Sequence, residues 1–158
     1  MGRKIDYHDD PRAPKPNSLV PAVSVVVTNE AGEILLIHRT DNDNWGLPGG
    51  AIDLEESISQ AGIRETREET GIECEITGLV GVYSDPRHVI HYTSNDEVRR
   101  EFSIVLTARP LSGQPTPSEE SSEVRWITSD DLHRYQMDSS MRQRIGHYLE
   151  RRDAPVVA

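Results

Sequence analysis

Glutamates gathered at the end of one predicted helix are the residues of this chain most suited to chemistry. Glu65, Glu68 and Glu69 lie close together, and Thr70-Gly71 follows them directly. A helix C-terminus carries partial negative charge, so Lys or Arg would be favoured there instead. Because positions three and four apart share a helix face, the carboxylates should project from one patch. A patch of this kind needs compensating positive charge.

Divalent cations are one source of that charge. Carboxylates this close raise one another's pKa unless cations lie between them. Dense oxygen ligands suit Mg²⁺ or Mn²⁺, and Mg²⁺ commonly bridges protein carboxylates to substrate phosphates. The residues alone leave a second interpretation open, a solvated acidic face in which Arg64 and Glu68 form an ordinary i,i+4 ion pair.

Length and charge limit the possible functions. A chain of 158 residues suits one domain with a real core. Its net charge of -10, from 17 basic and 27 acidic side chains, has the wrong sign for gripping a phosphate backbone, which excludes polymeric nucleic acid as a partner. A small phosphorylated substrate is compatible with this charge if divalent cations mediate.

The start of the chain and its cysteine usage indicate a compartment. The first residues, "MGRKIDYHDDPRAP", lack the apolar segment of a signal peptide, and no apolar stretch is long enough to span a bilayer. Cys74 is the only cysteine, which agrees with a reducing environment and disfavours a thiolate zinc site. We therefore expect a cytoplasmic protein with no membrane contact.

Turn residues and apolar periodicity predict the elements that position the glutamates. Residues 1–18, with prolines among charges, are expected to form an extended N-terminal arm, followed by a domain over 19–152 and a short tail over 153–158. The runs 22–29 and 33–39 predict a hairpin whose turn uses Asn29 and Gly32.

Further elements complete an α+β pattern with two main helices. A helix is expected from about Glu55 to Glu69, ended by Gly71, and a second amphipathic helix from Ser139 onward. Strands are expected in the segments 44–50, which ends in a glycine turn, 74–84, 97–110 and 123–128.

The glutamate cluster belongs to a longer pattern that resembles the Nudix box, G-x5-E-x7-R-E-U-x-E-E-x-G-U, where U is a bulky apolar residue. The matching residues are Gly50, Glu56, Arg64, Glu65, Glu68, Glu69, Gly71 and Ile72. Thr66 departs from the pattern at the first U position and should bury less apolar surface. The likeness extends over roughly residues 19–150. It implies a Nudix-like α/β/α sandwich with a mixed sheet and a loop-helix-loop metal site.

The resemblance also implies an activity, the hydrolysis of a diphosphate linkage in a nucleoside diphosphate derivative such as ADP-ribose or a nucleotide sugar. Mg²⁺ or Mn²⁺ would be the cofactor. By position, Glu65, Glu68, Glu69 and the backbone carbonyl of Gly49 become metal ligands. Glu65 could also accept a proton from the attacking water. Glu56 and Arg64 would orient these ligands by hydrogen bonds.

The resemblance also implies a further catalytic glutamate, because members of that family often place one on a loop outside the box, shortly before a strand that contains Trp. The stretch "PSEESSEVRWI" has this layout, and Glu120 is our choice because it lies six residues before Trp126. Glu119 and Glu123 are alternatives. Glu97 and Glu101 are more distant candidates.

Substrate contacts are harder to predict because nucleoside pockets have no short signature. Arg39 and Arg87 are candidates for binding phosphate, and Tyr83 and Phe102 for stacking on a base. Pro86 lies near the place where ADP-ribose pyrophosphatases of this family tend to carry a proline.

Alternatives to this activity remain at this point. One is a pyrophosphohydrolase acting on nucleoside triphosphates, (d)NTPs, which needs the same metal core. A second is a non-catalytic nucleotide-binding Nudix module, and a third is a structural domain that the acidic helix merely solubilises. A homodimer is also possible, since dimers are frequent in the family that the chain resembles.

Overall fold

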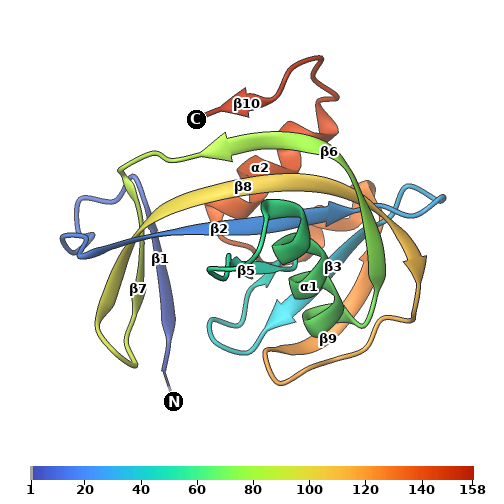
Figure 1. Cartoon of the computed structure of the whole chain (residues 1–158). Helices are drawn as coiled ribbons and strands as arrows, with labels where there is room; N and C mark the ends of the chain where they lie inside the picture. The colour runs from blue at the N-terminus through green and yellow to red at the C-terminus, as the bar shows by residue number, and fades with distance from the viewer. Residues whose placement is uncertain (1) are drawn as a thin grey trace.

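The computed structural model describes residues 2–158, which form one mixed seven-stranded sheet, a three-stranded sheet and two α-helices (Figure 1). In the large sheet the strands follow the order β1-β7-β8-β2-β5, with β6 pairing a further part of β8 and β10 pairing β6; the small sheet has the order β4-β3-β9. The elements are β1 (Lys4–His8), β2 (Ser18–Val27), β3 (Ile34–Arg39), β4 (Trp45–Gly46), β5 (Gly49–Ala51), α1 (Ile58–Thr70), β6 (Glu73–Tyr83), β7 (His88–Tyr92), β8 (Glu97–Ser112), β9 (Ser121–Ile127), a 3-10 turn (Ser129–Arg134), α2 (Ser139–Leu149) and β10 (Val156–Val157).

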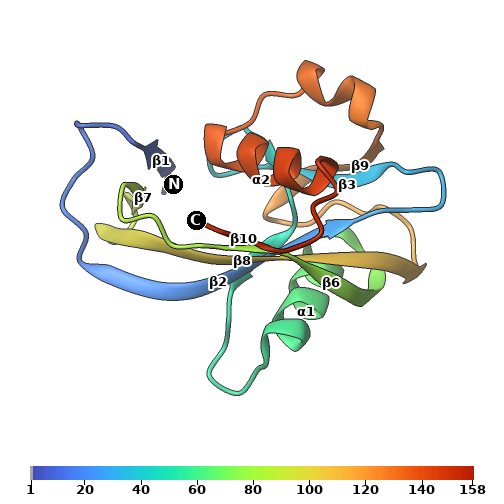
Figure 2. The same ribbon diagram turned by 90° about the horizontal axis from the view of Figure 1, so that it is seen from above.

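Alternation along the central strands gives each helix its own apolar face to cover. Val25 of β2 and Leu106 of β8 join the core cluster of α1, which includes Ala61. Their sequence neighbours Val26 and Val105 point the other way, into a second cluster with Ile145 of α2. Figure 2 shows the result, with α1 and α2 on opposite faces of the large sheet. The predicted α/β/α sandwich is therefore confirmed.

Helix α1 starts later than the sequence suggested, at Ile58 instead of about Glu55. Ser57 is its N-cap and forms a capping box with Gln60, which satisfies backbone donors that would otherwise have no partner. The end of the helix is as predicted, because Gly71 adopts a left-handed conformation with φ 77° and donates its N–H to the Arg67 carbonyl.

The ends of the chain differ from the expected arm and tail. Lys4–His8 is not a free arm but the strand β1, which pairs antiparallel with β7. Asn17 exchanges hydrogen bonds with Val98, and Ser18 already belongs to β2. In the tail, Val156–Val157 pairs with β6. These short strands take up sheet edges, which leaves fewer unpaired backbone groups there. The domain limits at 19 and 152 stay a prediction.

The predicted hairpin over 22–39 forms only near its turn. Asn29 accepts a hydrogen bond from the Gly32 N–H in a tight turn, but only the bridge Thr28–Ile34 joins the two strands. Beyond it, β2 pairs with β8 and β3 pairs with β9, so the two strands enter different sheets. The predicted strand over 44–50 is likewise split into β4 and β5, with Pro48 between them.

No helix of residues 2–158 is long and apolar enough to cross a membrane.

Two buried threonines of α1 allow a test of local packing. The Oγ1 atom of Thr66 has no hydrogen-bond partner within residues 2–158, whereas Thr70 donates to the Thr66 carbonyl and accepts from the Ile72 N–H. We expect Thr66→Val to stabilise the fold by about 1 kcal/mol, because it removes an unsatisfied hydroxyl at nearly constant volume. The melting temperature Tm should rise by about 2–4 °C.

Thr70→Val is the matched control for this test. It leaves the Ile72 N–H without its acceptor, so the free energy of unfolding should fall by about 1–2 kcal/mol. Thermal melts of both variants beside wild type provide the comparison. Destabilisation by Thr66→Val of a size similar to that by Thr70→Val would show that the Thr66 hydroxyl has a partner in solution.

Candidate metal centre

The glutamates of α1 open onto one acidic cleft. The loop that precedes β9 forms its other wall, so that the last turns of α1 face that loop across an open space of about 450 Å³. The residues that line the cleft are Arg64, Glu65, Glu68, Glu69, Ser118, Glu119 and Glu120. The predicted loop residue Glu120 thus lies in the same cleft as the box glutamates. Its backbone carbonyl accepts a hydrogen bond from the Thr40 N–H.

Glu69 is the most buried carboxylate of this cleft, with 2% of the residue exposed. Its Oε1 accepts a long hydrogen bond of 3.3 Å from the Gly49 N–H, and its Oε2 meets no donor in the part of the chain that the structure describes. Burial, followed by interaction with the neighbouring Glu65 carboxyl, raises the pKa of Glu69 to about 9. A buried carboxylate oxygen without a partner is costly unless a cation or a proton satisfies it.

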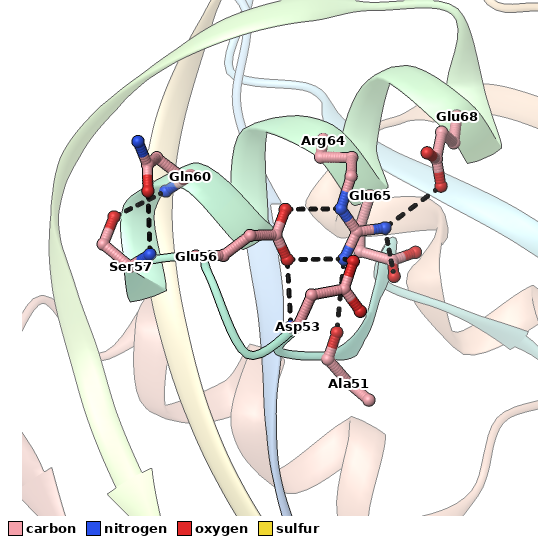
Figure 3. Close-up of polar contacts among 8 residues, drawn as sticks. All are labelled: Ala51, Asp53, Glu56, Ser57, Gln60, Arg64, Glu65 and Glu68. Atoms are coloured by element: carbon pink, nitrogen blue, oxygen red, sulfur yellow. Dashed lines mark hydrogen bonds and ion pairs between the residues drawn. The ribbon is translucent and has the colours of Figure 1, made fainter.

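Arg64 binds two other carboxylates of the cleft, Glu65 and Glu68, and also Glu56 in the loop before α1 (Figure 3). Its guanidinium donates to both oxygens of Glu56, at 2.5 and 2.8 Å, and to Glu65 and Glu68, at 3.0 and 3.2 Å. It also reaches the Ala51 carbonyl at 3.3 Å. The hydrogen bonds from Arg64 lower the pKa of Glu56 to about 2. One side chain therefore fastens the loop before α1 to the acidic face of that helix.

The residues fit a divalent cation by their chemistry, although residues 2–158 hold no group of three His, Cys, Asp or Glu side chains gathered as a finished metal site. Glu65 and Glu68 instead turn to the Arg64 guanidinium, which supplies positive charge between them. The Glu69 oxygen that has no donor lies in the same cleft. An acidic cleft with an unsatisfied buried oxygen suits a hard cation such as Mg²⁺ or Mn²⁺.

Gly49 and Gly50 of β5 connect this cleft to a second cavity. A Cβ atom on Gly50 would lie 2.5 Å from Oε1 of Glu65, so any side chain here would push that carboxylate away. The same two glycines line a cavity of about 120 Å³. Ser24 and Ser103 also line it and point to the face of the sheet that α2 covers.

Arg39 is the predicted substrate residue that the structure brings to this cavity. Its guanidinium is fixed by two hydrogen bonds to Asp41, at 2.9 and 2.8 Å. Burial raises the pKa of Glu69, and the positive charge of Arg39 acts against that rise. Arg39 therefore lies where it can act on an anion near the metal cleft.

The other predicted substrate residues lie elsewhere. Arg87 is exposed on the turn after β6 and pairs with Asp85 and Asp9. Tyr83 is buried in the core beneath α2, where its hydroxyl hydrogen-bonds to Nδ1 of His147 at 2.8 Å. Phe102 packs with the core cluster of α1, on the opposite side of the sheet from the cavity. None of the three lines either the cleft or the 120 Å³ cavity.

Of the alternative catalytic glutamates, only one lies in the acidic cleft. Glu119 lines the acidic cleft beside Glu120. Glu123 lies on β9 and pairs with Arg125, and Glu97 forms a pair with Arg99 at 2.9 Å. Glu101 lines the 120 Å³ cavity instead of the metal cleft.

Sequence analysis missed several charged residues of the cavity, namely Lys4, Asp6, Asp138 and Arg144. Asp6 is hydrogen-bonded to Nε2 of the buried His88 at 2.9 Å. The available signal was the alternation of charged and apolar residues in the segment "KIDYH", which is typical of a strand with one polar face. Its partner strand is distant in the sequence, so the alternation alone could not reveal a cavity.

Comparison with known proteins identifies the family. The model of the NUDIX domain matches residues 18–148. A "MutT-like protein" from Streptomyces ambofaciens is 36% identical over 111 residues, which are 70% of this chain and 65% of that relative. The chain thus spans just under two thirds of that relative's length. An "ADP-ribose pyrophosphatase" from Methanocaldococcus jannaschii is 31% identical over 76% of this chain and 69% of its own.

Other relatives carry different names. A "Putative 8-oxo-dGTP diphosphatase" from Bacillus subtilis is 30% identical over 75% of this chain and 73% of its own. Among solved structures, a NUDIX hydrolase from Nitrosomonas europaea superposes with a TM-score of 0.71 at 24% identity, covering 90% of this chain and 77% of that one. This chain belongs to the NUDIX family. The expected membership of this family is thereby confirmed.

The role of Arg64 can be tested without changing the charge of the site. Arg64→Lys keeps the positive charge but cannot hold Glu56, Glu65 and the Ala51 carbonyl together, because an ammonium lacks the planar fork. We expect Mn²⁺ binding, measured by calorimetry, to weaken about 10–100-fold. Arg67→Lys, on the exposed side of α1, is the matched control and should bind Mn²⁺ like wild type. Equal Mn²⁺ affinity of the two variants would show that Arg64 does not position the metal ligands.

The buried carboxyl of Glu69 predicts a pH dependence of stability in EDTA. Its pKa is about 9 in the folded protein against an ordinary 4.5, so the folded state holds this proton more tightly than the unfolded state. Wild type should therefore lose stability relative to Glu69→Gln as pH rises from 4.5 to 9, by at most about 1.4 kcal/mol per pH unit.

Urea unfolding at pH 5, 7 and 9 measures this difference. Glu73→Gln, an exposed carboxylate outside the cleft, is the control, and its difference from wild type should show no comparable trend. A difference between wild type and Glu69→Gln that does not change with pH would contradict the raised pKa of Glu69.

Proposed function

We propose that this chain is a divalent-metal-dependent hydrolase that cleaves a diphosphate linkage in a nucleoside diphosphate derivative of the ADP-ribose or nucleotide-sugar type. The observation that carries this proposal is the buried Glu69 oxygen without a donor, in a cleft that holds Glu65, Glu68 and Glu120. A cleft so rich in carboxylates would repel a diphosphate unless cations lay between them. A bound divalent cation would satisfy the Glu69 oxygen and would also screen the diphosphate from the carboxylates.

Glu65, Glu68, Glu69 and the backbone carbonyl of Gly49 would hold Mg²⁺ or Mn²⁺. When bound, the metal supplies charge that neutralises the diphosphate and makes a water molecule more acidic. The Gly49 N–H already contacts Glu69, which supports a place for this backbone segment beside the carboxylates. Arg64 and Glu56 fasten the loop before α1 to the helix that carries the proposed ligands.

Glu120 and Glu65 are the candidates for the general base. Both line the cleft, and Glu120 comes from a loop on the wall opposite α1, where it can receive a proton from water attacking phosphorus. Glu119 is the alternative on the same loop. Arg39, held by Asp41, lies near enough to Glu69 for their charges to interact and is placed to neutralise a phosphate oxygen at the edge of the cleft.

Two alternative functions share these residues. A (d)NTP pyrophosphohydrolase needs the same metal cleft, and the name of the Bacillus relative favours it, whereas the name of the Methanocaldococcus relative favours ADP-ribose. A non-catalytic nucleotide-binding module is less well supported, because the full set of box carboxylates is present. A cytoplasmic location and a homodimer stay predictions.

The function is tested by product release from ADP-ribose, nucleotide sugars, dinucleotides and (d)NTPs with Mg²⁺ or Mn²⁺. We expect one substrate class to turn over, and Glu68→Gln to reduce kcat at least about 100-fold, because it removes a charged metal ligand. Glu120→Gln should lower kcat more than Glu119→Gln if Glu120 is the base. Glu73→Gln is the control and should retain wild-type turnover.

Folding of each variant is checked by circular dichroism and a thermal melt. The products show which phosphorus–oxygen bond breaks. Absence of metal-dependent turnover across the panel, or wild-type turnover by Glu68→Gln, would contradict the hydrolase proposal and favour the binding module.

A further inference from the structure

A cavity beside the metal cleft carries hydrogen-bond donors that the protein itself does not use. We infer that this cavity binds the nucleobase of the substrate, and that Lys4 and Arg144 donate to carbonyl oxygens, which selects an oxo-base such as guanine or uracil over adenine. The inference rests on the proposed function. It narrows the proposed substrates to derivatives of guanine or uracil nucleotides and leaves ADP-ribose out.

The cavity is built on a sheet face with an unusual polarity. Alternation places Lys4 and Asp6 of β1 on the same side as Arg99 and Glu101 of β8, and all four line the cavity. Figure 1 shows β1 and β7 at one end of the long strands β2 and β8. α2 contributes Arg144 from across the cavity. A sheet face beneath a helix is normally apolar, so charges here indicate a polar ligand.

Several of these charges are already paired within the protein. Asp6 pairs with His88 at 2.9 Å, with both side chains 6% exposed. Arg99 pairs with Glu97, and Arg39, outside the helix-covered part, pairs with Asp41. These pairs have fixed geometry and little hydrogen-bonding capacity left for a ligand.

Arg144 and Lys4, in contrast, form no hydrogen-bonded ion pair among the described residues. Arg144 is 5% exposed, and its Nε and Nη2 atoms have no hydrogen-bond acceptor among the described residues. The nearest carboxylate, Glu101, lies 3.8 Å from Nη2, beyond hydrogen-bond length, while the ring of Tyr83 supports the guanidinium at 5.1 Å. Lys4 is half-buried and has no ion pair within residues 2–158 that reaches 4 Å. The two buried Arg144 donors are costly without a ligand.

The character of these donors decides the ligand chemistry. Arg or Lys donating to O6 and N7 is the commonest specific contact to guanine, and uracil likewise presents carbonyl oxygens. Adenine offers an amino donor beside its ring nitrogen, an edge that Asn or Gln matches better than Arg. Glu101, next to Arg144, can accept from the ring N–H that neighbours a carbonyl in both oxo-bases.

A phosphate group fits the cavity less well than a base. Asp6, Glu101 and Asp138 line the same space and would repel a dianion. Gly49 and Gly50 border both the cavity and the metal-ligand glutamates, so a nucleotide can place its diphosphate in the cleft and its base in the cavity. The small residues of β5 leave room for the link between the two.

The test measures binding of the reaction products, which does not require turnover. Dissociation constants of GMP, UMP and AMP with Mg²⁺ are determined by calorimetry for wild type, Lys4→Met and Arg144→Lys. We expect wild type to bind GMP or UMP at least about tenfold more tightly than AMP. Each variant should weaken the oxo-nucleotides about tenfold and change AMP binding much less. The comparison of GMP with UMP identifies which oxo-base the cavity prefers.

Lys15→Met is the matched control, because Lys15 lies on the segment between β1 and β2 and does not line the cavity. It should bind all three nucleotides like wild type. Arg144→Lys keeps the buried charge, and a melt of each variant confirms folding. Tighter binding of AMP than of GMP and UMP, or equal weakening of all three nucleotides by the variants, would overturn the inference.

Failure of this inference is distinguishable from failure of the proposed function. Metal-dependent hydrolysis of ADP-linked substrates in preference to GDP- and UDP-linked ones would overturn base selection and leave the hydrolase intact. If no nucleotide is bound or hydrolysed, the proposed function fails, and base selection fails with it.

Discussion

The compensation of negative charge at the C-terminal end of α1 is the constraint on which the site depends. Glu65, Glu68 and Glu69 lie where the helix dipole already disfavours anions, and Arg67 is the only basic residue of the last turn. Arg64 supplies positive charge to two of these carboxylates through hydrogen bonds to Glu65 and Glu68. The third, buried and without a full set of donors, holds a proton more tightly than an ordinary glutamate does. The cost of this arrangement falls when a cation binds.

Local features of the site were predictable from the sequence because they depend on short-range geometry. The spacing of Glu65, Glu68 and Glu69 placed them on one helix face, and Gly71 marked the helix end that the structure shows. The second helix begins at Ser139, as its apolar spacing indicated. The family resemblance was also informative, since it singled out Glu120, which lines the cleft.

Long-range pairings were not predictable in the same way. β1 pairs with a strand about 80 residues away, and neither β7 nor β10 was recognised as a strand, because such short segments carry few alternating positions. The helix was expected from about Glu55 but begins at Ile58, and Glu56 binds Arg64 from the preceding loop. Tyr83 and Phe102 were chosen by residue type, but only the sheet pairing determines which face a strand residue reaches.

The acidic cleft and the neighbouring cavity have opposite electrostatic requirements, in a chain whose net charge is -10. The cleft has an excess of carboxylates and needs cations, whereas the cavity has donors to spare and needs acceptors. Arg39 lines the cavity, and its positive charge acts against the rise in the pKa of Glu69 that burial causes. In the binding mode proposed above, the phosphates of an anionic nucleotide meet metal ions and its uncharged base meets Lys4 and Arg144. The strand β5, which borders both environments, would then orient the substrate.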